Sequence, residues 1–482
     1  MLEIYRLFLK RIGLVGVTNF LVALNTIILI PILTKTVGAT DYGIWVQVMT
    51  TFFLVTSVAN LGFPFTMLRF LSTETDKKKI QESFYSMLSL ILIVSFIISS
   101  ILLLFSKEIA VILFNGNILI VYLLGPLLIF GSANGFLIDY FVTFSQTKKY
   151  SFFLLFQTYF SLLLISYFAF LWKSISLIVL GFLIAQIILL FLMMFFIIRD
   201  IDFRIPNFSY ITEYLHFSLP TIPSNLSNWI VESSDRYVIG IVLGTTFVAY
   251  YSPGYTLGMV ILLFSAPLSV ILPSILPKYY ENGQISEVMK FINYSMKYFL
   301  LIAIPMVFGL SILSKPIMMI LTTPEIALNG YLVTPFVALS SLLLGVYGII
   351  ANLIILEKKT KIIGGIWTIA ALISLLNLIF VPYFGILAAA AITLISYLFA
   401  FVFSFYYVSK SFKIPFDYIF LIKTFVASFF VSAMIFLVNP EGILGIVLII
   451  GISIVIYLLL IIVMGAISKN EIKFFKNFFI NK

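Results

Sequence analysis

One short segment of this 482-residue sequence carries the polar side chains that are best placed to do chemistry. Its five polar positions are separated by three, four, three and one residues, so an α-helix brings them to a single face. The surrounding run, Leu219–Leu243, is apolar and long enough to cross a bilayer. Because charged groups are costly inside a membrane, we expect this face to meet protein or a water-filled cavity. The five residues are Asn225, Asn228, Glu232, Asp235 and Arg236.

The charged residues of this face allow two interpretations, and both stay open from the sequence. In the structural one, Glu232 and Arg236 lie at positions i and i+4 and neutralise each other as an ion pair. In the functional one, Arg236 binds an anionic ligand, or Glu232 or Asp235 binds a coupling proton or Na⁺. The functional interpretation is favoured, because one arginine would face two carboxylates.

Composition predicts a polytopic membrane protein. The chain is 62% hydrophobic and 10% charged, whereas a soluble domain carries about 25% charged residues. With no cysteine and a single histidine, His216, the chain has neither thiolate ligands nor a histidine cluster for a metal. We therefore expect no metal site and no resident cofactor.

Fourteen apolar runs are long enough to cross the membrane as helices, from Ile12–Leu33 and Gly43–Phe70 to Ile443–Ile467. Assigning alternate loops to the cytoplasm places 21 of the 29 Lys and Arg residues there and only 4 in the opposite loops. This bias predicts a multi-pass protein of the cytoplasmic membrane with both termini inside. It also accounts for most of the net charge of +10, so we expect no nucleic-acid partner.

An internal duplication predicts the architecture. At an offset of 206 residues, Val37–Trp45 aligns with Leu243–Tyr251, and both segments are turns after the first span of a six-span half. Both halves start on the same side, so the repeat is parallel and cargo is expected at the interface of the halves. We therefore expect an all-α fold of two six-helix lobes around a central cavity, plus two C-terminal helices. The predicted domains are residues 1–208, 209–412 and 413–482.

Three other polar residues in or beside predicted spans are candidates for the cavity. Asp139, late in the fourth span, is either a cation site or a residue that reaches the interface. Arg69 and Lys297 either snorkel to the headgroup phosphates or line the cavity.

Several segments resemble the polysaccharide-exporter (O-antigen flippase-like) branch of the multidrug/oligosaccharidyl-lipid/polysaccharide exporter superfamily. They are "IPILTKTVGATDYGIW" near the start, "LPTIPSNLSNWIVESSDRYVIGIVLGTTFVAYYS" in the middle and "KKTKIIGGIWTIAALISLLNLIFVPYFGILAAAAITLISY" later. The resemblance covers nearly the whole chain in order.

The resemblance implies that a lipid-linked oligosaccharide is moved from the cytoplasmic to the outer leaflet by alternating access, with ion coupling. Arg236, with Arg69 or Lys297, would bind the anionic pyrophosphate. Asn225 and Asn228 would offer the sugars a polar surface, and the lipid tail would stay in the bilayer. A polysaccharide polymerase and glycosyltransferases are the expected protein partners of a monomeric transporter.

Two other functions are weighed against the flippase. A multidrug or cation antiporter would use Glu232, Asp235 and Asp139 as acidic residues for cationic cargo. A membrane-embedded glycan polymerase would need a sizeable external loop or an acid/base pair near the surface, and neither is apparent. We therefore expect a transporter and not an enzyme.

Overall fold

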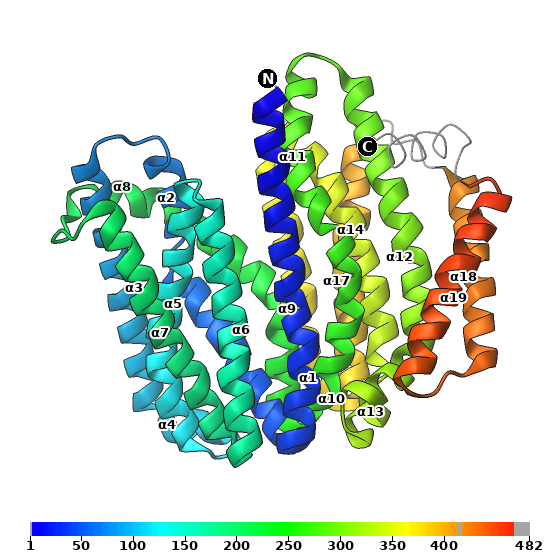
Figure 1. The fold of residues 1–482 in the computed structure, drawn as a ribbon, viewed down its shortest axis with the longest axis horizontal. Coiled ribbons are helices and arrows are strands. Elements are labelled where there is room, and N and C mark those ends of the chain that lie inside the picture. The colour runs from blue at the N-terminus through cyan, green and yellow to red at the C-terminus, as the bar shows by residue number, and fades with distance from the viewer. Residues whose placement is uncertain (1, 413–416, 467–482) are drawn as a thin grey trace. The chain divides into compact units, whose positions relative to one another are not determined.

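The structure of the protein, a computed structural model, describes residues 2–412 and 417–466 (Figure 1). Every regular element in these residues is a helix, which confirms the all-α prediction. Helices suit a hydrocarbon solvent, because an α-helix satisfies its backbone N–H and C=O groups within its own segment. Lys413 and the predicted cytoplasmic tail, residues 468–482, lie outside the described residues.

By packing, the described chain divides into two compact units. The first consists of residues up to Ser252 together with Trp367–Ala389, and the second of Pro253–Ile366 together with the residues from Ala390 onward. The domain boundaries that we expected after residues 208 and 412 follow the duplication rather than the packing, and they stay a prediction.

The first unit contains most of the N-terminal helices. They are α1 (Leu2–Ala59), α2 (Phe63–Leu71), α3 (Lys77–Leu104), α4 (Ser106–Leu113), α5 (Ile118–Thr143), α6 (Thr147–Trp172), α7 (Ile175–Ile201), α8 (Ile211–Ser218), α9 (Ile222–Val242) and α16 (Asn377–Phe384), with the 3₁₀ turns η1 (Phe208–Tyr210) and η2 (Leu219–Thr221).

The second unit contains the later helices. They are η3 (Val260–Phe264), α11 (Ala266–Glu281), α12 (Ile285–Leu321), α13 (Pro324–Gly330), α14 (Val333–Leu356), α18 (Tyr418–Val438) and α19 (Gly442–Val463). Three helices belong partly to each unit, namely α10 (Thr245–Met259), α15 (Thr360–Ser374) and α17 (Ile386–Ser409).

Twelve helices in the described residues are long and apolar enough to cross a membrane, so the chain is a multi-pass membrane protein. One of them, Gly13–Ala59, has non-helical backbone at Gly38 (φ 82°, ψ −177°), so α1 contains the first predicted span and the greater part of the second. α9, the predicted seventh span, is not among the twelve, because three charged residues interrupt its apolar stretch. The exact number of fourteen spans stays a prediction.

The predicted second span, Gly43–Phe70, is not one helix. α1 ends at Ala59, and the backbone turns through positive φ at Leu61 (49°) and Gly62 (71°) before α2 begins. A side chain at Gly62 would not fit, because a Cβ atom there would lie 2.4 Å from Thr221 Oγ1. The break therefore lets the segment that precedes α9 approach this backbone closely.

The duplicated turns keep the same backbone geometry. Gly38 and Gly244, which are 206 residues apart, both have positive φ (82° and 99°). Thr40 and Thr246, at the same offset, share a hydrogen bond with Oγ1 atoms 2.9 Å apart. Residues that meet their own equivalents lie on a two-fold axis, so this contact supports the repeat.

Burial follows the same six-span period. In each candidate span, we compare how much of its most apolar stretch is buried. The buried share is half or more in α5, α7, α14 and α17, and it does not exceed a third in any other candidate span of the described residues. These four helices are the fourth and sixth spans of each predicted half. In the first unit, α5 packs against α1, α3 and α7.

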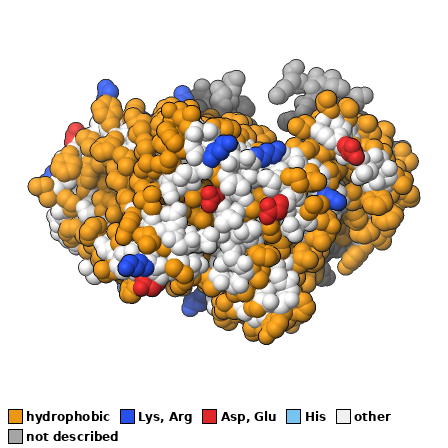
Figure 2. Space-filling view, turned by 90° about the horizontal axis from the view of Figure 1, so that it is seen from below, with side chains coloured by type: hydrophobic (Ala, Val, Ile, Leu, Met, Phe, Trp, Pro, Cys, Tyr) orange, Lys and Arg blue, Asp and Glu red, His pale blue; other side chains and the backbone are white. Residues whose placement is uncertain are grey.

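The surface is that of a protein that faces lipid. Large apolar side chains are widely exposed, up to 82% at Leu437 and Val463. Figure 2 looks onto one end of the helices, and even there hydrophobic side chains cover much of the face, with charged ones scattered. Such a surface is unstable in water and suits acyl chains.

Ion pairs gather three of the predicted cytoplasmic loops at one end of the first unit. Lys77 pairs with Asp202 (2.6 Å) and Lys149 with Asp200 (2.7 Å). These contacts join the loops after the second, fourth and sixth predicted spans, as alternation of the loops requires. That this end faces the cytoplasm stays a prediction.

Candidate functional site

The candidate site is built on α9, which forms as the sequence predicts. Pro223 lies in its first turn, where the missing N–H has no intrahelical acceptor to lose. Within the first unit, α9 packs against α1 and α16. The helix presents the five polar residues on one face, as the spacing predicted.

Asp235 is the most buried charged residue of this face, at 1% exposure. Its Oδ2 atom accepts a hydrogen bond from the hydroxyl of Tyr251 in α10. Its Oδ1 atom accepts from the backbone N–H of Arg236 at 2.8 Å and from Arg236 Nη1 at 3.0 Å. Three donors therefore compensate the loss of water around this carboxylate.

Arg236 is held along its own helix. Besides its contact with Asp235, Nη1 donates to the backbone carbonyl of Glu232 at 2.6 Å. The guanidinium lies 6.0 Å from the centre of the Tyr251 ring, and 13% of the side chain is exposed. In the sequence, Asp235 argued against a purely structural ion pair, because it gave Arg236 a second carboxylate to face. In the structure, Asp235 is itself an ion-pair partner of Arg236.

The rest of the face is more accessible. Glu232 is exposed, and Asn225 and Asn228 are partly buried. The Oδ1 atom of Asn228 is buried and has no hydrogen-bond partner among the described residues. Within one helix, the face therefore offers an exposed carboxylate, a tethered guanidinium and an unsatisfied amide oxygen.

Gln47 of α1, which the sequence did not single out, contacts the backbone of α9 beside this polar face. Its Nε2 atom donates to the backbone carbonyl of Arg236 at 2.7 Å. It lies against Gly240, where a Cβ atom would come within 1.8 Å of Nε2. Nearby, the hydroxyl of Tyr237 donates to Thr51 Oγ1 at 2.6 Å. The only signal for these partners was their polarity within apolar runs.

We expect Gly240→Ala to destabilise the protein, because the added methyl group must displace Gln47 from the Arg236 carbonyl. The loss of one partly buried hydrogen bond and the strain should cost about 1–3 kcal/mol, measured as a lower melting temperature in detergent. Gly309→Ala in α12 is the matched control, since nothing lies within 4 Å of its Cβ position. Equal melting temperatures of the two variants would contradict the role of Gln47.

The other candidate residues lie on other helices. Arg69 is exposed in the last turn of α2, and Asp139 is partly buried on α5, both in the first unit. Lys297 is on α12 of the second unit, with its Nζ atom 5.5 Å from the centre of the Phe420 ring. Within the described residues, no three His, Asp or Glu side chains are grouped so that they could hold a metal ion.

Two comparisons concern the sequence. A family model described as "Polysaccharide biosynthesis protein" matches residues 8–276, which is more than half of the chain. A curated relative, the probable low-salt glycan biosynthesis flippase Agl15 of Haloferax volcanii, is 26% identical over 215 residues, covering 44% of this chain and 45% of the relative. The chain thus matches less than half of the length of that relative.

Solved structures share the fold. The lipid II flippase MurJ in an inward closed conformation aligns with a TM-score of 0.78 at 19% identity, covering 93% of this chain and 98% of MurJ. An inward-facing multidrug resistance MATE family transporter of the MOP superfamily aligns with a TM-score of 0.66 at 13% identity, covering 82% and 95%. The predicted fold of this superfamily is therefore confirmed. All these relatives are named as flippases or transporters, which agrees with the expectation that the chain is not an enzyme.

Proposed function

Because the chain belongs to the polysaccharide biosynthesis protein family, we propose that it moves a lipid-linked oligosaccharide from the cytoplasmic to the outer leaflet for surface polysaccharide assembly. The sugars and the pyrophosphate of such a lipid are too polar to cross about 30 Å of hydrocarbon unaided. A protein of the cytoplasmic membrane with both termini inside, which presents its polar residues alternately to the two sides, meets this need.

The observation that carries this proposal is the polar face of α9 with its tethered arginine. A guanidinium binds pyrophosphate oxygens through two parallel N–H donors, and the partly exposed side chain of Arg236 is within reach of a ligand. Asn228 lies eight residues before Arg236, about 12 Å along the helix, and Asn225 lies nearly one turn further. Sugars attached to the pyrophosphate would extend along these amides. Arg69 and Lys297 remain proposed as further cations for the headgroup.

Ion coupling follows from the competition for Arg236. The pyrophosphate and Asp235 are both anions that attract the Arg236 guanidinium. Binding of either one therefore weakens the electrostatic attraction between the guanidinium and the other. A proton or Na⁺ taken up by Asp235 would release Arg236 to the pyrophosphate, and loss of the ion would return it. Glu232 and Asp139 are the alternative carboxylates for this role. The polymerase and glycosyltransferase partners and the monomeric state belong to the same proposal.

One observation favours a second candidate, a multidrug or cation antiporter. Glu232 is exposed, whereas most of the Arg236 side chain is covered, so the accessible charge on α9 is partly acidic. An acidic surface attracts cationic cargo. The fold is compatible with this function as well, because MATE transporters share it.

Deletion of the gene followed by mass analysis of lipid-linked sugars tests the two candidates. We expect polyprenyl-pyrophosphate oligosaccharides to accumulate inside the cell and surface polysaccharide to be lost, with both restored by a plasmid-borne copy. A deletion strain with normal surface polysaccharide and a raised sensitivity to cationic drugs would instead identify an antiporter.

A further inference from the structure

The segment between α7 and α8, residues 202–207, is held against α3 at both of its ends. It belongs to the first unit and has no regular secondary structure. The hydroxyl of Tyr85 donates to the backbone carbonyl of Asp202 at 3.0 Å, and the hydroxyl of Ser86 donates to that of Asn207 at 2.7 Å. The path of the segment is therefore fixed by α3.

These bonds place the segment at the edge of the membrane. The apolar run of α3 begins at Phe84, so Tyr85 and Ser86 are its second and third residues. From Phe84 to its end at Leu104, the helix measures about 31 Å, which matches a hydrocarbon thickness of about 30 Å. Lys77, where α3 begins, lies about 10 Å further out. The segment is thus level with the lipid head groups.

At this level, the charged side chain of the segment turns toward the protein and the apolar ones turn away from it. Arg204 pairs through Nε with Glu82 Oε1 at 3.1 Å, and Asn207 donates from Nδ2 to Glu82 Oε2 at 3.3 Å. Glu82 is buried. The residues on either side of Arg204 are Phe203 and Ile205, which are 66% and 78% exposed. A loop in water favours the opposite arrangement, with the charge outside and the apolar side chains covered.

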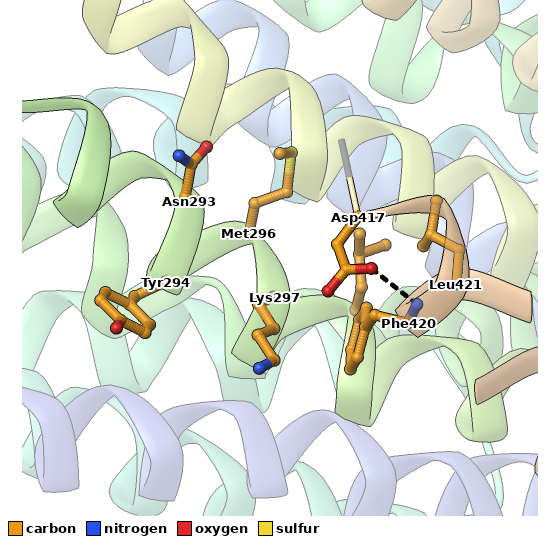
Figure 3. Close-up of a pocket in the computed structure, with 8 residues that line it drawn as sticks. Asn293, Tyr294, Met296, Lys297, Asp417, Phe420 and Leu421 are labelled. Atoms are coloured by element: carbon orange, nitrogen blue, oxygen red, sulfur yellow. Dashed lines mark hydrogen bonds between the residues drawn. The ribbon is translucent and has the colours of Figure 1, made fainter. Parts of the chain in front are cut away.

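Such exposure is not shared by every aromatic residue at the edge of a span. Phe420, near the start of α18 in the second unit, is 3% exposed and lies beside Lys297 of α12 (Figure 3). The ring of Phe203 meets that of Tyr85 edge to face, with 5.3 Å between the ring centres, yet most of the side chain stays open. The open side of Phe203 is therefore available to an apolar neighbour.

The exposed surface of α7 identifies this neighbour as lipid. Phe191, Phe195 and Ile198 are all exposed, and their spacing of four and three residues puts them in one stripe along the helix. A spanning helix turns such a stripe to the acyl chains. The stripe ends shortly before Phe203, so the apolar surface continues into the segment. Arg199, an exposed cation beside the end of the stripe, suits the phosphates of lipid head groups.

We propose that this segment binds the membrane surface by inserting Phe203 and Ile205 among the lipid head groups at the predicted cytoplasmic side. The two side chains enter the boundary between head groups and acyl chains to a depth of about 5–10 Å. The ion pair between Arg204 and Glu82 draws the intervening side chain toward the protein and leaves its two neighbours outside. The segment thus anchors the first unit at a set depth in the leaflet, and this role does not depend on the proposed transport.

The lack of native cysteine allows a direct test by spin labelling of the full chain. Phe203→Cys and Ile205→Cys are each labelled with a nitroxide in nanodiscs of phosphatidylcholine and phosphatidylglycerol. Electron paramagnetic resonance then measures collisions of the label with oxygen, which concentrates among acyl chains, and with a water-soluble nickel chelate. We expect both labels to favour oxygen, at a depth of about 5–10 Å. Phe195→Cys is the lipid reference, and Thr75→Cys, exposed in the turn before α3, is the water reference.

Two outcomes of this measurement would overturn the proposal. Nickel accessibility at either position as high as that of the Thr75→Cys label would show that the segment faces water. Low accessibility to both reagents would show that protein covers the segment, either a partner or a second copy of the chain.

Glu82→Ala tests whether the ion pair orients the segment. The variant removes the partner of Arg204, so the Ile205→Cys label should shift from oxygen toward nickel. Glu74→Ala is the matched control, because Glu74 pairs with Lys79 outside the segment. An unchanged label in Glu82→Ala would contradict the orienting role of the ion pair. The depth measurement itself keeps Glu82, so it decides the proposal even if this variant folds poorly.

Discussion

Arg236→Ala should abolish surface polysaccharide while the amount of protein in the membrane stays unchanged. The substitution removes the guanidinium proposed to bind the pyrophosphate, and the alanine offers no charge-assisted hydrogen bond in its place. Arg236→Lys should restore activity in part, because lysine keeps the charge but not the two parallel donors. Surface polysaccharide is measured by immunoblotting of cells that lack the chromosomal gene and carry the variant on a plasmid.

A double variant separates binding from folding. Arg236→Ala leaves the buried carboxylate of Asp235 without its cation, and breaking a buried ion pair costs about 3–5 kcal/mol. Asp235→Asn combined with Arg236→Ala removes both charges and relieves that penalty. If Arg236 only neutralises Asp235, the double variant should regain surface polysaccharide. If Arg236 binds the pyrophosphate, the double variant should be as inactive as Arg236→Ala. Normal polysaccharide in Arg236→Ala itself would reject the binding role.

Asp235→Asn alone should flatten the dependence of flipping on an ion gradient. Asparagine has nearly the same shape: its oxygen can still accept the Arg236 backbone N–H, and its amide N–H can donate to the Tyr251 hydroxyl, but it cannot take up a proton and binds Na⁺ poorly. A gradient of one pH unit is worth about 1.4 kcal/mol per proton, so the coupled wild type should shift the leaflet ratio about tenfold. The measurement uses proteoliposomes that contain a labelled lipid-linked oligosaccharide, at imposed pH or Na⁺ gradients.

Glu232→Gln is the companion variant, because it removes an exposed carboxylate from the same helix. If this variant alone loses the gradient response, coupling belongs to Glu232 rather than to Asp235. If the response is unchanged in both variants, coupling does not run through α9.

The sequence predicted the features that depend on local patterns. Apolar runs indicated the spans, and the spacing from Asn225 to Arg236 indicated the polar face of α9. The 206-residue offset predicted equivalent turns, and Gly38 and Gly244 confirm it by their shared positive φ. Each of these signals lies within about one helix or one turn, where periodicity and backbone freedom decide the outcome.

The environment of the charged residues could not be predicted in the same way. Asp235 is bonded by Tyr251 of the next helix, and the backbone beside it, at Arg236, is bonded by Gln47, almost two hundred residues earlier in the chain. Such contacts depend on which helices become neighbours, and a single sequence does not encode that in any local pattern.

The break at Gly62 was missed although Asn60, Gly62 and Pro64 are turn-forming residues, because they stand within a longer run that is mostly apolar. The close approach of Thr221 requires a glycine there.

The hydrogen bond between Thr40 and Thr246 has a consequence for how such a chain can evolve. A contact between equivalent residues is the geometry of a homodimer, in which every residue must exist in both copies. Joining the copies in one polypeptide keeps the contact and frees each half to diverge. At the positions equivalent to Glu232, Asp235 and Arg236, the first half has Thr26, Leu29 and Ile30. A pair of identical subunits would have brought two such charged clusters into the membrane, and the fused chain carries the cost of only one.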